Sequence, residues 1–244
     1  MAIKFSTTRA EAAQSGVKIL LYGDAGFGKT RAAATAPRPV IVSAESGLLS
    51  LAGYDLPVVV VRNVNDFNEV YRWVTESAEA KGFDTVYIDS LSEIAEQVLS
   101  NAKAQVKDPR QAYGELIEKT MMSIRAFRDL PGKHVIMTAK MERIKDDMTG
   151  SVMYQCSMPG TKLGPQIPYL FDEVFRLGIG KTPEGVDYRF FQTQPDLQYA
   201  AKDRSGRLDP IERPDFTFVI NKILAGTSQA PAPASQPEAT SQAS

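Results

Sequence analysis

The sequence predicts an α/β fold in which a mostly parallel central sheet is flanked by helices and bordered by antiparallel edge strands. Two observations indicate this class. Short, wholly apolar runs alternate along the chain with longer segments whose apolar residues recur at helical spacing, which is the pattern of βαβ units. A glycine-rich loop with the spacing G-x-x-x-x-G-K-T lies between the first apolar run and a helical segment, as in parallel sheets that bind phosphates.

The apolar runs predict the strands. Strands that are buried on both faces read as continuous apolar runs, and such runs cover residues 17–22, 39–44, 57–61, 85–89 and 134–138. Further strands at one edge of the sheet are expected over residues 173–179, 188–193 and 197–201. Together these runs account for a parallel centre and an antiparallel edge.

Segments with helical periodicity predict the helices between and after these strands. They cover residues 31–36, 66–80, 91–106, 113–130 and 215–224. Residues 140–166 are polar, contain glycine and have no clear period, so we expect a long loop there. Long loops in compact domains are often functional.

Composition sets the domain organisation. With 43% hydrophobic residues the chain can bury a sizeable core, and we expect one core domain over residues 1–224. Residues 225–244 are almost all Ala, Pro, Ser, Gln and Thr, which bury too little surface to fold. They predict a disordered tail.

Several function classes are disfavoured by composition. No run approaches the ~18 apolar residues that a membrane helix needs, and the N-terminus lacks the apolar core of a signal peptide, so we expect a cytoplasmic protein without membrane contact. The single cysteine, Cys156, forms no internal disulfide, in agreement with a reducing compartment. The net charge is −1, so any nucleic-acid site must be a local patch.

The glycine-rich loop is the strongest chemical signal. Its glycines let successive N–H groups point at phosphate oxygens, its lysine reaches the β and γ phosphates, and its threonine ligates magnesium. ATP and Mg²⁺ are therefore the expected cofactors. The expected phosphate-binding residues are Gly23, Asp24, Ala25, Gly26, Phe27, Gly28, Lys29 and Thr30.

Asp89 is the expected second magnesium residue beside Thr30. It ends an apolar run and belongs at the carboxyl edge of the sheet, where a carboxylate can hold a magnesium-bound water. Ser90 and Glu93 fit the S-x-x-E capping box, so Ser90 is open to a capping role or a phosphate-side contact. These features indicate nucleotide binding but are shared by kinases and GTPases.

The order of the remaining features resembles RecA. Residues 39–48 place Glu45 just past the second expected strand, and this segment resembles the one in which RecA carries a glutamate that orients the attacking water. Residues 164–179 resemble the helix and strand after the second DNA-contacting loop of RecA. The resemblance covers most of residues 17–224 and is closest to the core-only recombinases and single-strand annealing proteins of bacteriophages.

The resemblance implies a RecA-like P-loop core that hydrolyses ATP with Lys29 and Glu45 as catalytic residues. It also implies a homo-oligomer, a filament or a ring, in which Lys202 and Arg204 reach the γ-phosphate of a neighbouring subunit. A polar hairpin turn is the alternative for these two cations. Where RecA has a glutamine sensor, this chain has Thr138 and Lys140, so either residue is a candidate for that role.

DNA contact is expected in the long loop. Cations that neutralise phosphates and a ring that can stack on bases are typical of single-strand binding, although Asp146 and Asp147 dilute the charge. A solvated surface loop is the alternative. The candidate contacts are Lys140, Arg143, Lys145, Tyr154 and Lys162.

Three functions follow. The first is an ATPase that assembles on single-stranded DNA and promotes annealing or strand exchange, with a single-strand-binding protein as a further partner. The second is a DNA-binding module in which ATP is only a structural switch. The third is a P-loop transferase or GTPase, which is disfavoured because the guanine-reading motif N-K-x-D and an arginine-rich lid are not found.

Overall fold

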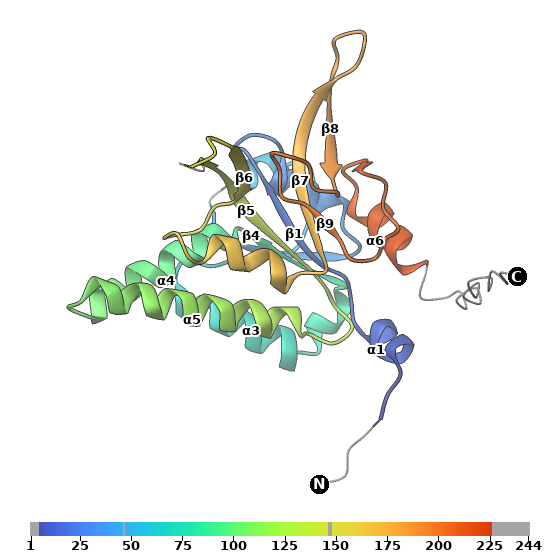
Figure 1. Cartoon of the computed structure of the whole chain (residues 1–244). Coiled ribbons are helices and arrows are strands. Elements are labelled where there is room, and N and C mark those ends of the chain that lie inside the picture. The colour runs from blue at the N-terminus through green and yellow to red at the C-terminus, as the bar shows by residue number, and fades with distance from the viewer. Residues whose placement is uncertain (1–4, 46, 146–147, 226–244) are drawn as a thin grey trace, which may run out of the picture.

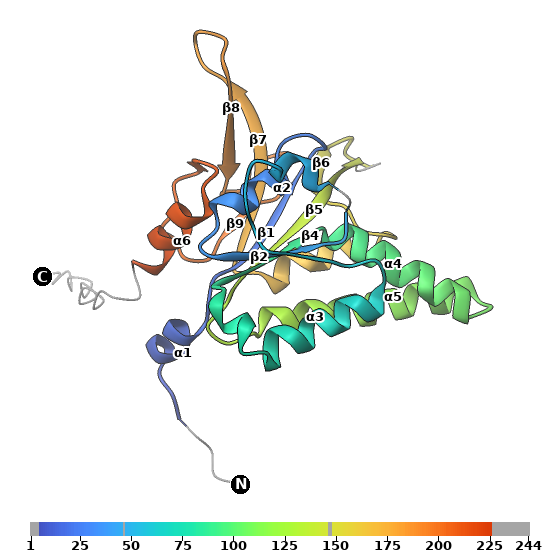
Figure 2. The same cartoon turned by 180° about the vertical axis from the view of Figure 1, so that it is seen from behind.

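The structure is a computed structural model that describes residues 5–45, 47–145 and 148–225. Within this part of the chain a ten-stranded sheet forms the centre, with helices on both faces (Figures 1 and 2). The predicted fold class is confirmed, because the central strands are parallel and the strands at one edge are antiparallel. Except for Ala225, the predicted tail lies outside the described residues.

The parallel strands follow the order β3-β2-β4-β5-β1-β7. Their bounds are β1 (Lys18–Gly23), β2 (Pro39–Ser43), β3 (Val58–Val60), β4 (Thr85–Asp89), β5 (His134–Lys145) and β7 (Glu173–Lys181). Antiparallel partners are β6 (Val152–Cys156) on β5, β8 (Asp187–Gln192) and β9 (Lys202–Asp203) on β7, and β10 (Ile211–Glu212) on β8. The strand with the glycine-rich loop therefore lies inside the sheet.

Helices cover the two faces unequally. On one face lie α3 (Val64–Glu76), α4 (Leu91–Gln105), α5 (Pro109–Arg128) and the 3-10 helix η4 (Gly164–Leu170). On the other lie α2 (Lys29–Ala32), the 3-10 helix η1 (Ala33–Thr35) and α6 (Phe216–Leu224). The described part also contains α1 (Thr8–Gln14) and the 3-10 helices η2 (Leu48–Leu51) and η3 (Glu79–Gly82). None of its helices has the length and apolar character that crossing a bilayer requires.

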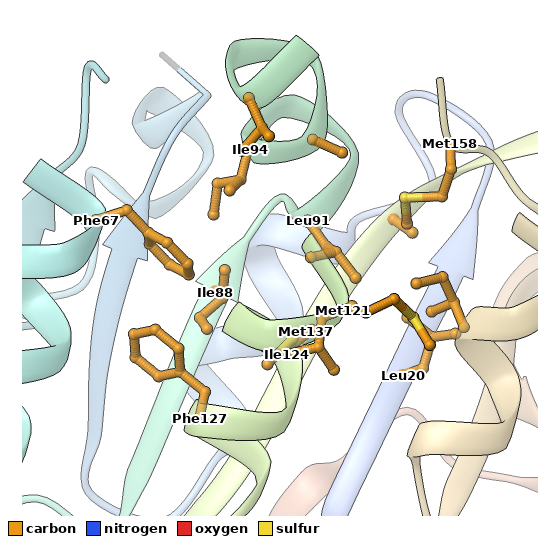
Figure 3. Packing of buried hydrophobic residues seen from close by; sticks show 14 of the residues in the cluster. Leu20, Phe67, Ile88, Leu91, Ile94, Met121, Ile124, Phe127, Met137 and Met158 are labelled. Atoms are coloured by element: carbon orange, nitrogen blue, oxygen red, sulfur yellow. The ribbon is translucent and has the colours of Figure 1, made fainter. Parts of the chain in front are cut away.

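Alternation along the strands builds two cores. Leu20 faces α4 and α5, whereas its neighbours Ile19 and Leu21 face α2 and α6, and all three are fully buried. The larger core contains a stack of Phe67 on Phe127, whose ring centroids are 4.7 Å apart (Figure 3). Burial on both faces explains why the strands are apolar throughout.

Two of the sequence predictions are wrong. Residues 140–166 do not form one long loop, because β5 continues to Lys145 and pairs with β6 in a hairpin. Charged residues make up most of the outer half of β5 (residues 140–145), so the sequence shows no alternation of apolar and polar residues that would predict a strand there. Residues 197–201 are not a strand, because the Asp196 carboxylate accepts hydrogen bonds from the N–H groups of Gln198 and Tyr199 and turns the chain. The short strand begins at Lys202 instead.

Candidate nucleotide-binding site

The phosphate loop connects β1 to α2 at the carboxyl edge of the sheet. β1 is buried along its whole length between β5 and β7, which fixes the start of the loop. Gly26 and Gly28 have φ values of 78° and 103°, a region that favours glycine, and Gly28 caps α2. The two glycines therefore set the curl that the motif predicts.

The loop opens into a cavity of about 560 Å³, which is a size that binds a cofactor or small ligand. The lining combines loop residues with residues that are distant in sequence. These are Gly23, Asp24, Ala25, Gly26, Gly28, Lys29, Thr30, Glu45, Ser50, Lys140 and Met141. Seven of the eight predicted phosphate-loop residues thus share one cavity with Glu45, and only Phe27 does not line it.

Lys29 is held over the loop. Its Nζ donates to the carbonyls of Gly23 at 2.8 Å and of Asp24 at 3.0 Å. Burial lowers the pKa of Lys29, and the carboxylates of Asp89 and Glu45 oppose this shift. Because its acceptors are neutral carbonyls, a phosphate oxygen would be a stronger partner for the ammonium group.

Thr30 and Asp89 are brought together as predicted. The Thr30 hydroxyl donates to Asp89 Oδ2 at 2.6 Å, and the Thr138 hydroxyl donates to Oδ1 at 2.5 Å. Burial raises the pKa of Asp89, while these two hydrogen bonds lower it. One hydroxyl and one carboxylate suit Mg²⁺, which takes few protein ligands and keeps waters and substrate phosphates. No cluster of three or more metal-ligating side chains occurs among the described residues.

Glu45 lies beside this group. The Ser90 hydroxyl donates to its carboxylate, and its backbone N–H, with that of Ala44, donates to the Asp89 carbonyl. Ser90 also caps α4 by accepting from the N–H of Glu93 at 3.3 Å. Of the two roles considered for Ser90, capping is confirmed, and its hydroxyl orients Glu45 as well.

Thr138 and Lys140 both reach the site. Besides the contact of Thr138 with Asp89, Lys140 lines the cavity and its Nζ forms ion pairs with Glu93 at 3.2 Å and Glu96 at 3.3 Å. Burial lowers the pKa of Lys140, but the two carboxylates outweigh it and leave the pKa raised. Lys140 therefore lines the phosphate-loop cavity of its own chain.

The other DNA-contact candidates are divided between two places. Arg143 and Lys145 are exposed on the β5–β6 hairpin. Lys162 lies on the loop after β6 and lines a separate cavity with Tyr113 of α5. The structure thus separates Lys162 from the hairpin cations.

Tyr154 is not an open stacking platform. Its ring stacks on Tyr199 with centroids 4.9 Å apart and planes 18° apart. The Arg176 guanidinium lies 3.5 Å from the centre of the same Tyr199 ring and 5.7 Å from that of Phe190. These four side chains, which we call the stacked ladder, join the β5–β6 hairpin to the β7–β8 hairpin.

Lys202 and Arg204 do not meet the phosphate loop of their own chain. β9 pairs with the first residues of β7, at the amino end of β1, whereas the loop follows its carboxyl end. Lys202 Nζ donates to the Pro168 carbonyl at 3.0 Å, and Arg204 forms an ion pair with Asp172 at 2.9 Å. Their action on a neighbouring subunit stays a prediction.

One contact with the loop was missed from the sequence. Arg189 of β8 donates from Nε to the Phe27 carbonyl at 2.7 Å. The sequence offered one signal for it. In the pattern Tyr188-Arg189-Phe190 the alternation of a strand puts the arginine on the face opposite the two rings, although the pattern does not name its partner.

Comparison with known proteins identifies one protein family. A protein-family model described as an AAA domain matches residues 15–205. No curated protein matches the chain. Among solved structures, a KaiC-like protein from the hyperthermophilic archaeon Pyrococcus horikoshii OT3 is 15% identical with a TM-score of 0.41, over 77% of this chain and 84% of that one.

Proposed function

We propose a function on the premise that this chain belongs to the AAA domain family and is a P-loop ATPase domain. The proposed activity is hydrolysis of Mg²⁺-bound ATP that depends on single-stranded DNA. The proposed role is assembly on that DNA to promote annealing or strand exchange.

The observation that carries the hydrolase proposal is the convergence of Lys29, Asp89 and Glu45 at one cavity. Lys29 would bind the β and γ phosphates, and Thr30 with Asp89 would hold Mg²⁺, which neutralises developing phosphate charge when bound. Glu45 would orient a water for attack and accept its proton, with its carboxylate held by Ser90. A carboxylate held beside the phosphate loop favours turnover over a module that only binds nucleotide.

Dependence on DNA is supported by the course of β5. This strand contributes Lys140 and Met141 to the cavity and, a few residues later, carries exposed Arg143 and Lys145. The exposed arginine and lysine side chains suit the phosphates of a single strand. Because both sites lie on one strand, a shift of β5 on DNA binding would reach the nucleotide.

Assembly into a homo-oligomer completes the proposal. Lys202 and Arg204 lie at the opposite end of the sheet from the loop of their own chain, so a head-to-tail neighbour could receive them at its nucleotide. Cations supplied in this way stabilise charge on the transferring phosphoryl group.

The test is a titration of ATP hydrolysis with single-stranded and duplex DNA. We expect stimulation by single strands that is lost in the double variant Arg143→Ala and Lys145→Ala. The matched control is Arg72→Ala with Lys81→Ala, which removes the same charge from an exposed surface around α3 and η3. An ATPase rate that is unchanged by DNA would refute the proposed dependence on single-stranded DNA. ATP binding without hydrolysis would favour the DNA-binding module in which ATP is a structural switch. A preference for GTP would favour the P-loop transferase or GTPase.

A further inference from the structure

The β7–β8 hairpin extends beyond the phosphate loop. β7 pairs with β1 up to Tyr22 and Arg176 and then continues to Lys181 with β8 alone beside it. Figure 1 shows this hairpin rising past the rest of the sheet. Its strands therefore offer side chains to the loop that follows β1.

The faces of the hairpin are set by two glycines. A Cβ at Gly178 would lie 2.4 Å from the Phe190 ring, and one at Gly180 would lie 2.8 Å from the Tyr188 ring. The rings thus lie across the glycine backbone on one face of the hairpin. Alternation sends Arg189 to the other face, where it meets the loop.

Arg189 contacts the loop at one peptide group. Its Nε donates to the Phe27 carbonyl at 2.7 Å, and a Cβ at Gly28 would be 3.3 Å from the same Nε. Glycine at position 28 therefore serves the close approach of the arginine as well as the positive φ of 103°.

Through the peptide between Phe27 and Gly28, the contact with Arg189 sets the direction of the Gly28 N–H. A trans peptide is planar, and its C=O and N–H groups point in opposite directions. With the Phe27 carbonyl held toward Arg189, the Gly28 N–H points away from it. Gly28 lines the phosphate cavity and Phe27 does not, as this orientation requires.

We infer that Arg189 is a positioning residue for the phosphate loop, which holds the Phe27–Gly28 peptide so that the Gly28 N–H meets the diphosphate of a bound nucleotide. This inference rests on the proposed nucleotide binding. Arg189 acts within its own chain and through the loop, so it contributes to binding of ADP and ATP alike.

The test measures dissociation constants for MgADP and MgATP by calorimetry. Arg189→Met keeps an unbranched side chain as far as the position of Nε and removes the donor, and we expect both constants to rise about tenfold or more, the effect of one hydrogen bond from a charged group. Arg189→Lys keeps a charged donor and should stay within about twofold of wild type. The matched control is Lys181→Met, which removes a cation from the same hairpin and should change neither constant.

A split in the kinetics separates this role from general damage. At saturating ATP the Arg189→Met protein should keep the kcat of wild type while its KM rises, because the water and the γ-phosphate are not touched. Equal affinities for wild type and Arg189→Met, or a loss in Arg189→Lys as large as in Arg189→Met, would overturn the inference. Failure of the wild type to bind nucleotide would instead overturn the proposed function.

Discussion

The hydroxyl of Thr138 donates a hydrogen bond of 2.5 Å to Oδ1 of Asp89, while Thr30 of the phosphate loop donates to the other carboxylate oxygen. The buried first half of β5 is thereby connected through the Asp89 carboxylate to Thr30, the other residue expected to hold magnesium. Thr138 is fully buried, so water does not compete for this contact.

Thr138→Val is expected to raise the pKa of Asp89 further, because the buried carboxylate loses one of the two hydrogen bonds that lower it. The acid limb of the pH–rate profile for ATP hydrolysis should shift to higher pH. The free energy of unfolding should fall by about 1–3 kcal/mol from the unpaired buried acceptor. Thr138→Ser restores the hydroxyl and should return the pH profile to that of wild type. An unchanged profile in Thr138→Val would contradict the connection.

Glu45→Gln should leave ATP binding intact and slow hydrolysis by about 100-fold or more, because only proton acceptance from the attacking water is lost. Gln retains an oxygen for the Ser90 hydroxyl, so the local structure is preserved. Single-turnover measurements with saturating ATP check this. Glu118→Gln, an equal change on the exposed side of α5, is the control. Wild-type turnover in Glu45→Gln would remove Glu45 from the chemistry.

Lys29→Ala and Arg204→Ala proteins should each be inactive alone and recover ATPase activity when mixed. In a head-to-tail assembly about a quarter of the interfaces in an equal mixture combine an intact Lys29 with an intact Arg204. Arg207→Ala, an exposed cation in the following turn, is the control and should be active alone. If Arg204→Ala kept wild-type activity at every protein concentration, Arg204 would have no role in hydrolysis, and its ion pair with Asp172 would be its only assigned contact.

Glu173 should make the folded protein less stable as the pH rises. Burial and the nearby carboxylate of Asp203 raise the pKa of Glu173 from 4.5 to about 8, so the folded state keeps a proton that the unfolded state has lost. The free energy of unfolding then falls by roughly 1.4 kcal/mol per pH unit between these two values and levels off above them. The stabilisation is complete below pH 4.5, in the window where the unfolded chain also holds the proton.

The isosteric Glu173→Gln variant has no proton to lose. Denaturant unfolding of both proteins at several pH values should show a smaller slope for Glu173→Gln and a gain in its relative stability toward pH 8. Parallel curves for the two proteins would show that Glu173 is ionised in the folded state at neutral pH.

Local sequence signals predicted the parallel strands correctly, and they put the glycine-rich loop and Asp89 at the carboxyl ends of β1 and β4, where the structure has them. Each depends on residues that are close in the chain, with apolar runs long enough to require burial on both faces. The outer half of β5 could not be predicted as a strand, because four of the six residues 140–145 are charged and the two apolar ones do not alternate with them. The contact of Arg189 joins residues 162 positions apart, so no local pattern contains it. The separation of Lys162 from Arg143 likewise depends on a tertiary contact, because the loop after β6 that carries Lys162 lies beside α5.

The stacked ladder connects the β5–β6 hairpin to the β7–β8 hairpin through side chains, in addition to the backbone hydrogen bonds of the sheet. Tyr154 belongs to the β5–β6 hairpin, and Phe190 at the far end of the stack is the neighbour of Arg189 on β8. The Arg176 guanidinium donates from Nη1 to Gln192 Oε1 at 3.0 Å, whereas its Nε has no hydrogen-bond partner among the described residues, so this hydrogen bond and the rings together hold it in place. Close-packed groups transmit displacement instead of absorbing it. We therefore expect a displacement of the β5–β6 hairpin to reach the phosphate loop by two routes, along β5 to Lys140 and across the stacked ladder to Arg189 and the Phe27 carbonyl.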